Sequence, residues 1–468
     1  MAHHFGQAEQ PDKLRHYLQL AGEAAQASFA NEAAIDFYTR LLPLLTESPQ
    51  RVSVLIQLGD VLHFVGQKEA SAQRLQEALA LAAALPDEAG QARALFHLGG
   101  LWQGFSDYPA ALQFLARAQE IYTAVADTRG LCDVLAVIGD CHYYLGQYSE
   151  AEAALEHSLA LARTLSDHKK IAAALNYLGR AAFDQGAYDL VQQRYEESLT
   201  HSQAFDDKVM IATTINNLGI LASYRGDGAA TRACYEQALA IRREIGDRAG
   251  IGASLNNLGI LARDAGEYEK AIRLYQEALQ IDTEIGDKRA MSYPLKNLGV
   301  VALDLEQYDE AQAYYAEALA LRQEIGDKWG TASVLSSMGD VASAQKQYPQ
   351  AAHFFARSLR LNREIGDHGM DMHNFFGLAA AAAYPVPNTR PNLERAARLI
   401  GYCQGMLAQT GVAPQVWLQE EYEALMQTVK TALTEPVYAA CWQEGQALTL
   451  DQAVALALTE LSVAEERS

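Results

Sequence analysis

The sequence predicts an all-α solenoid in which antiparallel helix pairs follow one another along the chain. Three observations support this fold class: glycines recur at a fixed spacing, small and aromatic residues recur at fixed offsets after each glycine, and turn residues separate the units. Half of the 468 residues are hydrophobic and 20% are charged, which is typical of an ordered chain with a large core. In such repeat folds each unit packs on its neighbours, so the length of the chain does not indicate the number of domains.

The glycine spacing is 40 residues, and each glycine follows Leu, Ile or Met. The series is Gly59, Gly99, Gly139, Gly179, Gly219, Gly259, Gly299 and Gly339. Twelve residues later come Ala111, Ala151, Ala271, Ala311 and Ala351, and sixteen residues later come Leu75, Leu115, Leu155, Tyr195, Tyr235, Tyr275, Tyr315 and Phe355. Position nineteen is always Ala or Ser, from Ala78 to Ser358.

The small residues should let the two helices of a pair approach closely, while the aromatic residue should fill the gap toward the next repeat. We therefore expect a bulky residue at Gly259 to overpack the pair and cost about 1 to 3 kcal/mol.

This small, small, aromatic, small series resembles the framework of the tetratricopeptide repeat over about residues 10 to 367. The usual period of that family is 34 residues, so we expect longer helices and a capped turn between repeats. The resemblance implies a right-handed superhelical solenoid in which the first helix of each pair lines a concave surface.

Turn residues define the expected helix ends. In residues 244–268, Gly246 should end one helix, Asp247 should cap the next, and Gly266 should end that helix before another begins near Tyr268. Pro294 interrupts an equivalent segment, so the first helix of that repeat is expected to start at Pro294, where a missing N–H costs nothing.

Three regions follow from these patterns. Residues 1–47 are expected to form an N-terminal helix pair, because Gly22, Ala34 and Tyr38 reproduce the same offsets. Residues 48–367 form eight repeats, and residues 368–468 form a helical capping region. Within the capping region, the three prolines of residues 385–391 predict a loop.

Charge and composition exclude several functions. The formal charge of −21 opposes binding to nucleic acid and to anionic membranes. Five scattered cysteines signal neither a zinc site nor a disulfide framework, and no cofactor motif occurs. The sequence has no apolar stretch long enough to span a bilayer and no signal-peptide core, so we expect a cytoplasmic protein.

Candidate binding residues lie around the glycines on the first helices. Three positions before the glycine stand Asn176, Asn216, Asn256 and Lys296, and two positions before it stand Tyr177, Asn217, Asn257 and Asn297. Asparagine is a mediocre helix former, so its recurrence needs a reason. One hypothesis is that these amides bind the main chain of an extended peptide, as groove asparagines do in the long-repeat proteins of the family. The other hypothesis is a ladder of amides that bond one another between neighbouring helices, and both can hold together.

Aromatic and charged residues surround the asparagines. They include Tyr143, Tyr144, Phe183 and Tyr224, with Asp184, Asp264 and Asp304 among Arg180 and Arg263. Such a surface would suit a peptide with basic and apolar groups, although aromatic residues at this spacing are as often packing residues.

No motif for a catalytic reaction occurs, so the sequence favours a non-enzymatic binding protein with a protein or extended peptide as its partner. One alternative is a structural scaffold or self-associating module, in which terminal helices pair two chains into a homo-oligomer. Another alternative is a hydrolase that uses a groove carboxylate such as Asp264, which would require a closed pocket.

Both ends resemble large bacterial signalling proteins that join a cyclase or DNA-binding output, an ATPase and tetratricopeptide repeats. The first 45 residues are similar to the segment that follows the ATPase, and the end is similar to the closing element at Tyr438, Trp442, Glu444, Gly445 and the helix 453–458. Cys441 and Gln446 depart from the usual alanine and arginine. The resemblance implies the sensor arm of a regulator, with the ATPase or output module as a further partner.

Overall fold

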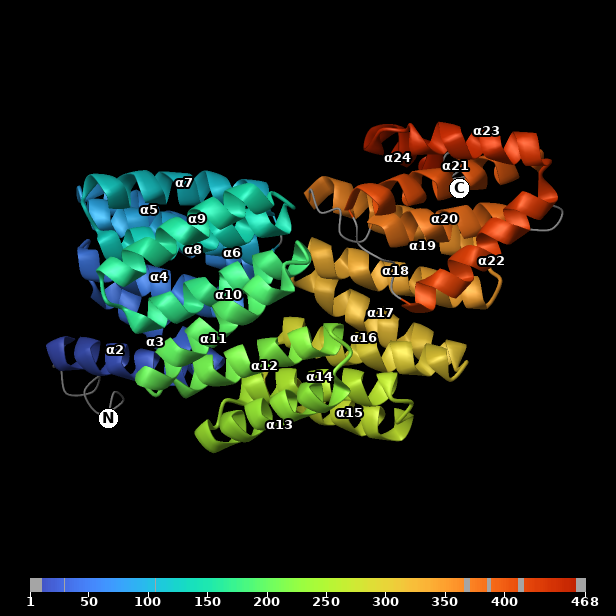
Figure 1. Cartoon of the computed structure of the whole chain (residues 1–468). Coiled ribbons are helices and arrows are strands. Elements are labelled where there is room, and N and C mark those ends of the chain that lie inside the picture. The colour runs from blue at the N-terminus through green and yellow to red at the C-terminus, as the bar shows by residue number, and fades with distance from the viewer. Residues whose placement is uncertain are drawn as a thin grey trace. The chain divides into compact units, whose positions relative to one another are not determined.

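The computed structural model describes residues 11–28, 30–105, 107–365, 371–384, 389–410 and 416–459. In these ranges every regular element is a helix (Figure 1). The first helices of nine pairs are α2 (Pro11–Ala27), α4 (Pro49–Phe64), α6 (Glu88–Gly104), α8 (Thr128–Tyr144), α10 (His168–Asp184), α12 (Lys208–Tyr224), α14 (Arg248–Asp264), α16 (Lys288–Asp304) and α18 (Lys328–Ala344).

The second helices follow after short turns. They are α3 (Asn31–Leu41), α5 (Lys68–Ala84), α7 (Tyr108–Ala124), α9 (Tyr148–Thr164), α11 (Tyr188–Ala204), α13 (Gly228–Ile245), α15 (Tyr268–Ile285), α17 (Tyr308–Glu324) and α19 (Tyr348–Ile365). A short 3₁₀ helix, η1 (Leu42–Leu44), follows α3. The predicted solenoid of paired helices with a 40-residue period is confirmed.

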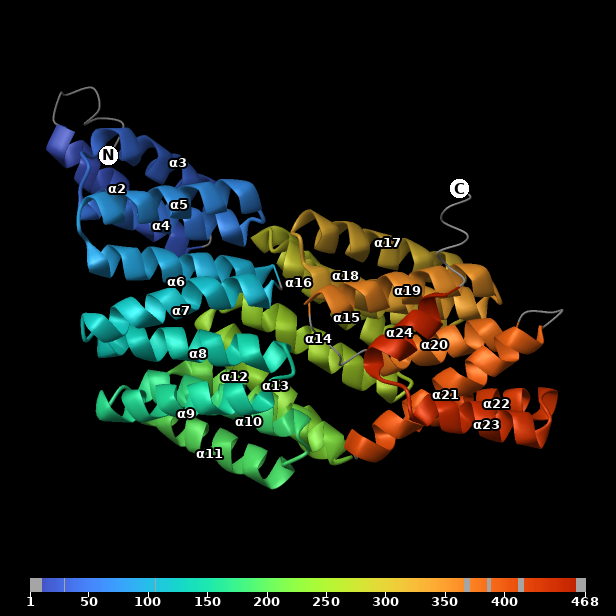
Figure 2. The same cartoon turned by 90° about the horizontal axis from the view of Figure 1, so that it is seen from above.

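The chain divides into two compact units. Unit 1 contains Met1–Pro294 and Leu321–Asp327, and unit 2 contains Leu295–Ala320 and Lys328–Ser468. In unit 1, the helices from α4 to α11 stack in chain order (Figure 2). The first helices of neighbouring pairs also contact one another, as α4 with α6, α8 with α10 and α10 with α12. This arrangement places them on the inner side of the stack.

Each repeat glycine packs under the side chain sixteen residues later. A Cβ on Gly259 would lie 2.5 Å from Cε1 of Tyr275, and a Cβ on Gly179 would lie 2.3 Å from Cε1 of Tyr195. The close approach of the two helices is therefore confirmed. The ring lies on the glycine of its own repeat and also packs toward the next repeat, as expected, since Tyr195 clusters with Leu221.

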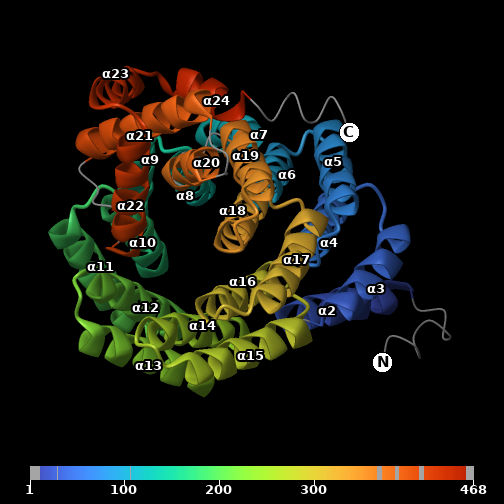
Figure 3. The ribbon, with the colours of Figure 1, turned by 90° about the vertical axis from the view of Figure 1, so that its right-hand side faces the viewer.

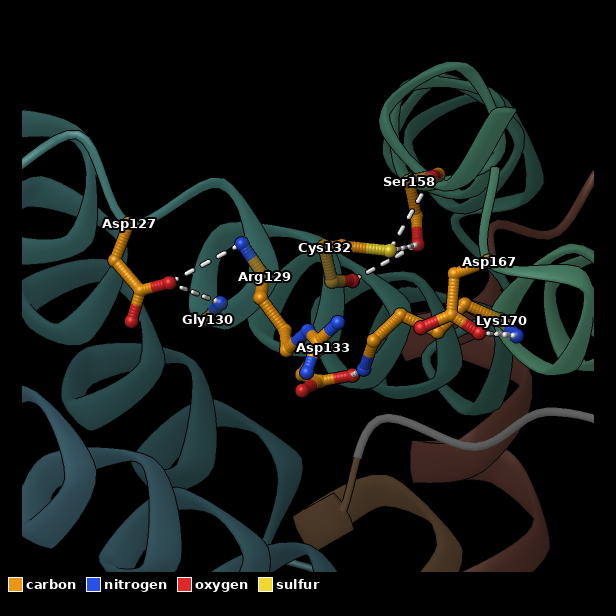
Figure 4. Close-up of polar contacts among 8 residues, drawn as sticks. All are labelled: Asp127, Arg129, Gly130, Cys132, Asp133, Ser158, Asp167 and Lys170. Carbon is orange, nitrogen blue, oxygen red and sulfur yellow. Dashed lines mark hydrogen bonds and ion pairs between the residues drawn. The ribbon is translucent and has the colours of Figure 1, made fainter. Parts of the chain in front are cut away.

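Serines at position nineteen tie the two helices of a pair together. Ser158 Oγ donates to the Cys132 carbonyl at 2.8 Å, and Ser198 Oγ donates to the Ala172 carbonyl at 2.9 Å. Figure 4 shows the Ser158 contact beside the cap of α8, where Asp127 accepts from the N–H groups of Arg129 and Gly130. The same figure shows Lys170 of α10 paired with Asp133 of α8.

Most predicted helix ends agree with the structure. Asp247 accepts from Gly250 N at 2.9 Å, and Gly246 closes α13 in the left-handed conformation with φ of 69°. Gly266 has φ of 73° and lies between α14 and α15, which begins at Tyr268.

The predicted start at Pro294 is wrong, because α16 begins at Lys288 and contains Pro294 in its interior. The N-cap of this helix is Asp287, which accepts from Ala290 N at 2.9 Å. An established first turn therefore carries the helix through the proline, whose missing N–H removes one internal hydrogen bond. The division between the two units falls directly after this residue.

Unit 2 ends in five further helices, α20 (Asp371–Ala383), α21 (Arg390–Thr410), α22 (Val416–Ala432), α23 (Glu435–Gln446) and α24 (Leu450–Leu458). Residues 385–388 of the predicted loop lie outside the described residues, and the helix begins at Arg390, before the loop was expected to end. In Figure 3, α21, α23 and α24 lie close together. Gly445 packs on the Arg398 carbonyl and Gly401 on the Trp442 carbonyl, so two glycines allow α21 and α23 to touch.

Candidate functional site

The asparagine side chains form hydrogen bonds between neighbouring first helices of unit 1. Asn217 Nδ2 donates to Asn176 Oδ1 at 2.9 Å, from α12 to α10. Asn257 Nδ2 donates to Asn216 Oδ1 at 2.8 Å, from α14 to α12. The amide ladder proposed from the sequence is confirmed for these two steps.

The two asparagine positions have different surroundings. At the position three before the glycine, Asn216 is only 8% exposed, and Asn176 Nδ2 also contacts Ser198 Oγ at 2.6 Å and Thr214 Oγ1 at 3.0 Å. These side chains point into the junction between helix pairs. Asn256 is half-buried at the same position.

At the position two before the glycine, Asn217 and Asn257 are half-buried. Within the described part of the chain, the ladder bond is the one side-chain hydrogen bond that each of them makes. Each amide therefore keeps its carbonyl oxygen and one N–H for another partner. The ladder fixes the orientation of the amide without using its full hydrogen-bonding capacity.

Arg180 and Tyr177 belong to a polar and aromatic cluster on α8 and α10. Arg180 forms an ion pair with Asp140, which also accepts from Gln103 and is 6% exposed. The guanidinium Cζ lies 4.4 Å from the ring centroid of Tyr143 and 5.3 Å from those of Tyr144 and Tyr177. Burial raises the pKa of the Tyr177 phenol, so this ring stays uncharged.

Asp140 was not among the residues predicted from the sequence. It directly follows the repeat glycine, as do Asp60 and Asp340 in two other repeats. Asp60 pairs with His97 at 2.8 Å and Asp340 pairs with His373 at 3.0 Å, so an acid at this position recurs as a partner for the neighbouring first helix. That recurrence is the signal that could have identified Asp140.

Tyr224 lies at the end of α12 and is 61% exposed. Its ring meets Phe183 edge-on with centroids 4.5 Å apart, and Tyr188 completes the group at 5.6 Å from Phe183. The side chain of Asp184 lies outside the described residues. The structure thus places an exposed aromatic group where the first helices α10 and α12 end.

Arg263 and Asp264 lie at the end of α14 and form an ion pair of 3.6 Å. The Asp264 side chain is 57% exposed. A carboxylate in solvent does not provide the closed pocket that the hydrolase interpretation requires.

Lys296 and Asn297 lie on the part of α16 that belongs to unit 2. Lys296 Nζ donates to Ser333 Oγ of α18 at 2.6 Å, and Asn297 is half-buried. Lys296 and Asn297 therefore belong to unit 2, whereas the two ladder bonds described above lie within unit 1.

Two features of the described residues bear on other functions. They contain no group of three or more His, Cys, Asp or Glu side chains that could hold a metal ion. Over the same residues, every helix is too short or too polar to cross a membrane.

The sequence profile of the tetratricopeptide repeat matches residues 130–204, 210–284 and 290–364. No curated protein matches the sequence. A solved structure of a Rap protein complexed with Competence and Sporulation Factor is similar, with a TM-score of 0.52, 14% identity, and coverage of 75% of this chain and 98% of that chain.

Two other solved structures have lower TM-scores. The apo form of the quorum sensor NprR from B. thuringiensis has a TM-score of 0.48 and 15% identity, over 75% of this chain and 99% of that chain. BtubC from P. vanneervenii has a TM-score of 0.40 and 22% identity, over 47% of this chain and 93% of that chain. The identities are low, so the similarity to the Rap protein is one of fold.

Proposed function

Because the chain is a tetratricopeptide-repeat solenoid, we propose that it binds an extended peptide or protein segment on the first-helix face of α10, α12 and α14. The observation that carries this proposal is the geometry of Asn217 and Asn257. Each amide is oriented by a bond to the preceding helix and keeps one acceptor and one donor, which is the pair that a peptide main chain requires.

The spacing of the ladder supports an extended ligand. Packed helices lie about 8 to 10 Å apart, and three residues of an extended polyproline II chain, which complete one turn, span about 9 Å. Successive ladder amides would therefore meet every third residue of the ligand. The Rap protein of the same fold was solved with Competence and Sporulation Factor, which is a precedent for a solenoid of this kind holding a partner.

Side-chain preferences of the ligand follow from Tyr224 and Asp264. Tyr224 offers an exposed ring and Asp264 an exposed carboxylate, so we propose a peptide with apolar and basic groups. Arg180 and Tyr177 of α10 would border this face. Lys296 and Asn297 of unit 2 stay predicted binding residues.

The test is selection from a displayed random peptide library, followed by affinity measurement for one selected peptide. The double variant Asn217→Ala, Asn257→Ala should bind about tenfold more weakly, because two neutral hydrogen bonds of about 0.5 to 1.5 kcal/mol are lost. Asn392→Ala, which lies outside the ladder, should bind as the wild type does. Equal affinity of a folded double variant would move the binding site elsewhere.

We also propose, from the resemblance at both ends, that the protein acts in the cytoplasm as the sensor or regulatory arm of a bacterial signal-transduction ATPase. Trp442 and Gly445 of the closing element have clear structural roles, since Trp442 Nε1 donates to Gln404 Oε1 at 2.7 Å and Gly445 packs on α21. Addition of the chain to the ATPase module of such a regulator should change its rate of ATP hydrolysis. An unchanged rate, with and without a selected peptide, would refute this role.

Self-association is the structural alternative, and the mass in solution separates it from peptide binding. The mass of a single chain at high protein concentration would exclude a homo-oligomer. A dimer whose formation is unaffected by the ladder variants would favour the scaffold.

A further inference from the structure

Asp282 of α15 carries a buried carboxyl group. It is 3% exposed, and its Oδ1 has no hydrogen-bond partner in the described part of the chain. Burial, followed by the nearby charge of Asp287, raises the pKa of Asp282 to about 7. Most carboxyls of folded proteins avoid such a position unless they are paired.

The glycine at the facing position of α14 makes room for this carboxyl. A Cβ on Gly252 would lie 2.5 Å from Asp282 Oδ1. The other 40-residue repeats carry a side chain at that position, namely Val52, Ala92, Cys132, Ala172, Ala212, Ser292 and Ala332. The glycine and the carboxyl thus form a matched pair in this repeat.

The basic side chains on the neighbouring helices α13, α14 and α16 bind other groups. Arg242 donates to Ser254 Oγ at 2.7 Å and to the Gly250 carbonyl at 3.0 Å. Arg248 pairs with Glu284, Lys288 with Glu324, and Arg289 with Asp327.

Asp287 is the charged group that acts on Asp282, and its own carboxylate caps α16 through Ala290 N. Among the described residues, the surroundings therefore provide one more negative charge and no cation that pairs with Asp282. They favour the protonated carboxyl.

We propose that the contact between Asp282 and Gly252 is a pH-sensitive contact that holds α14 against α15 when Asp282 is protonated and loosens when it ionises. Gly252 lies one turn before Asn256 and Asn257 on α14, so loosening this contact would disturb the neighbouring step of the ladder. This contact involves no ligand and does not depend on the proposed function.

The sign of the pH effect follows from the two protonation states. In the unfolded chain the Asp282 carboxyl has a pKa of about 3.9, whereas burial raises this pKa in the folded protein. The stabilisation by the protonated carboxyl is fully present below the pKa of the unfolded chain. It falls as the pH rises to about 7 and is lost above that pH. Each pH unit inside this window changes the unfolding constant by about tenfold.

The experiment compares the wild type with Asp282→Asn, which has nearly the same shape and cannot ionise. Denaturant unfolding gives an unfolding constant for each protein at pH 5 and at pH 8. The wild-type constant divided by the variant constant should be about 10- to 100-fold larger at pH 8 than at pH 5. Glu277→Gln removes an exposed carboxylate from the same helix and should leave the corresponding ratio constant. Hydrogen exchange in α14 and α15 of the wild type should also be faster at pH 8 than exchange chemistry alone explains.

A pH-independent ratio for Asp282→Asn would overturn the proposal. If that variant does not fold, the carboxyl of the wild type can be titrated directly by NMR after ¹³C labelling of aspartate. A midpoint above pH 6 for Asp282 would support the proposal, and a midpoint below pH 5 would refute it.

Discussion

Asn257 and Asn216 join two helix pairs through a side-chain hydrogen bond of 2.8 Å, in which the 8%-exposed Asn216 is the acceptor. Asn216→Ala should lower the free energy of unfolding by about 1 kcal/mol, because the bond is lost and the Asn257 amide is no longer oriented. Urea denaturation measures this change, with Asn392→Ala as the control. A neutral Asn216→Ala would show that the ladder contributes nothing to stability.

Gly259 lies under the ring of Tyr275, with no room for a Cβ. Gly259→Ala should therefore destabilise the protein by about 1 to 3 kcal/mol through overpacking. Gly228 begins α13 and has nothing within 4 Å of its added Cβ, so Gly228→Ala is the matched control. Thermal melting of both variants decides the matter, and equal melting temperatures would contradict the prediction.

Ala126 ends the turn after α7 in a left-handed conformation, with φ of 55°. Gly246 has the equivalent place three repeats later, with φ of 69°. Ala126→Gly should raise the free energy of unfolding by about 0.5 to 1 kcal/mol, because the Cβ is strained in this conformation. The reciprocal Gly246→Ala should lower it, and destabilisation in both cases would refute the argument.

Arg322 and Asp327 form a buried ion pair, with side chains that are 3% and 2% exposed. Asp327→Ala should cost about 3 to 5 kcal/mol, because it leaves a buried guanidinium without its carboxylate. Arg322→Met in the same chain should restore part of the loss by removing the charge. Additive losses in the double variant, measured by denaturation, would show that the two side chains act independently.

The period of the repeat, the caps and the close glycine contacts could all be predicted from the sequence. Each depends on residues within one pair, so spacing alone reveals it. Asp247 and Gly246, for example, act on backbone groups within a few residues. The prediction that α16 starts at Pro294 was wrong, because Asp287 caps this helix upstream of the proline.

Contacts between repeats were harder to predict. The recurrence of asparagine could be read from the sequence, but the donors lie two residues before the glycine and the acceptors three residues before it, which depends on how neighbouring helices are offset. The buried charged residues Arg242, Asp282 and Arg322 were not predicted. Their signal in the sequence is a shared position, twenty-three residues after the glycine in three successive repeats.

The constant period also shapes how such a protein can change by recombination. Loss of the 40 residues 208–247 would place Asn257 where Asn217 now stands, 41 residues after Asn176 as in the present ladder. The same hydrogen bond would form again, and the Asp caps would remain at the start of each helix. Duplication or deletion of one pair can therefore lengthen or shorten the amide row in whole steps, without redesign of either neighbour.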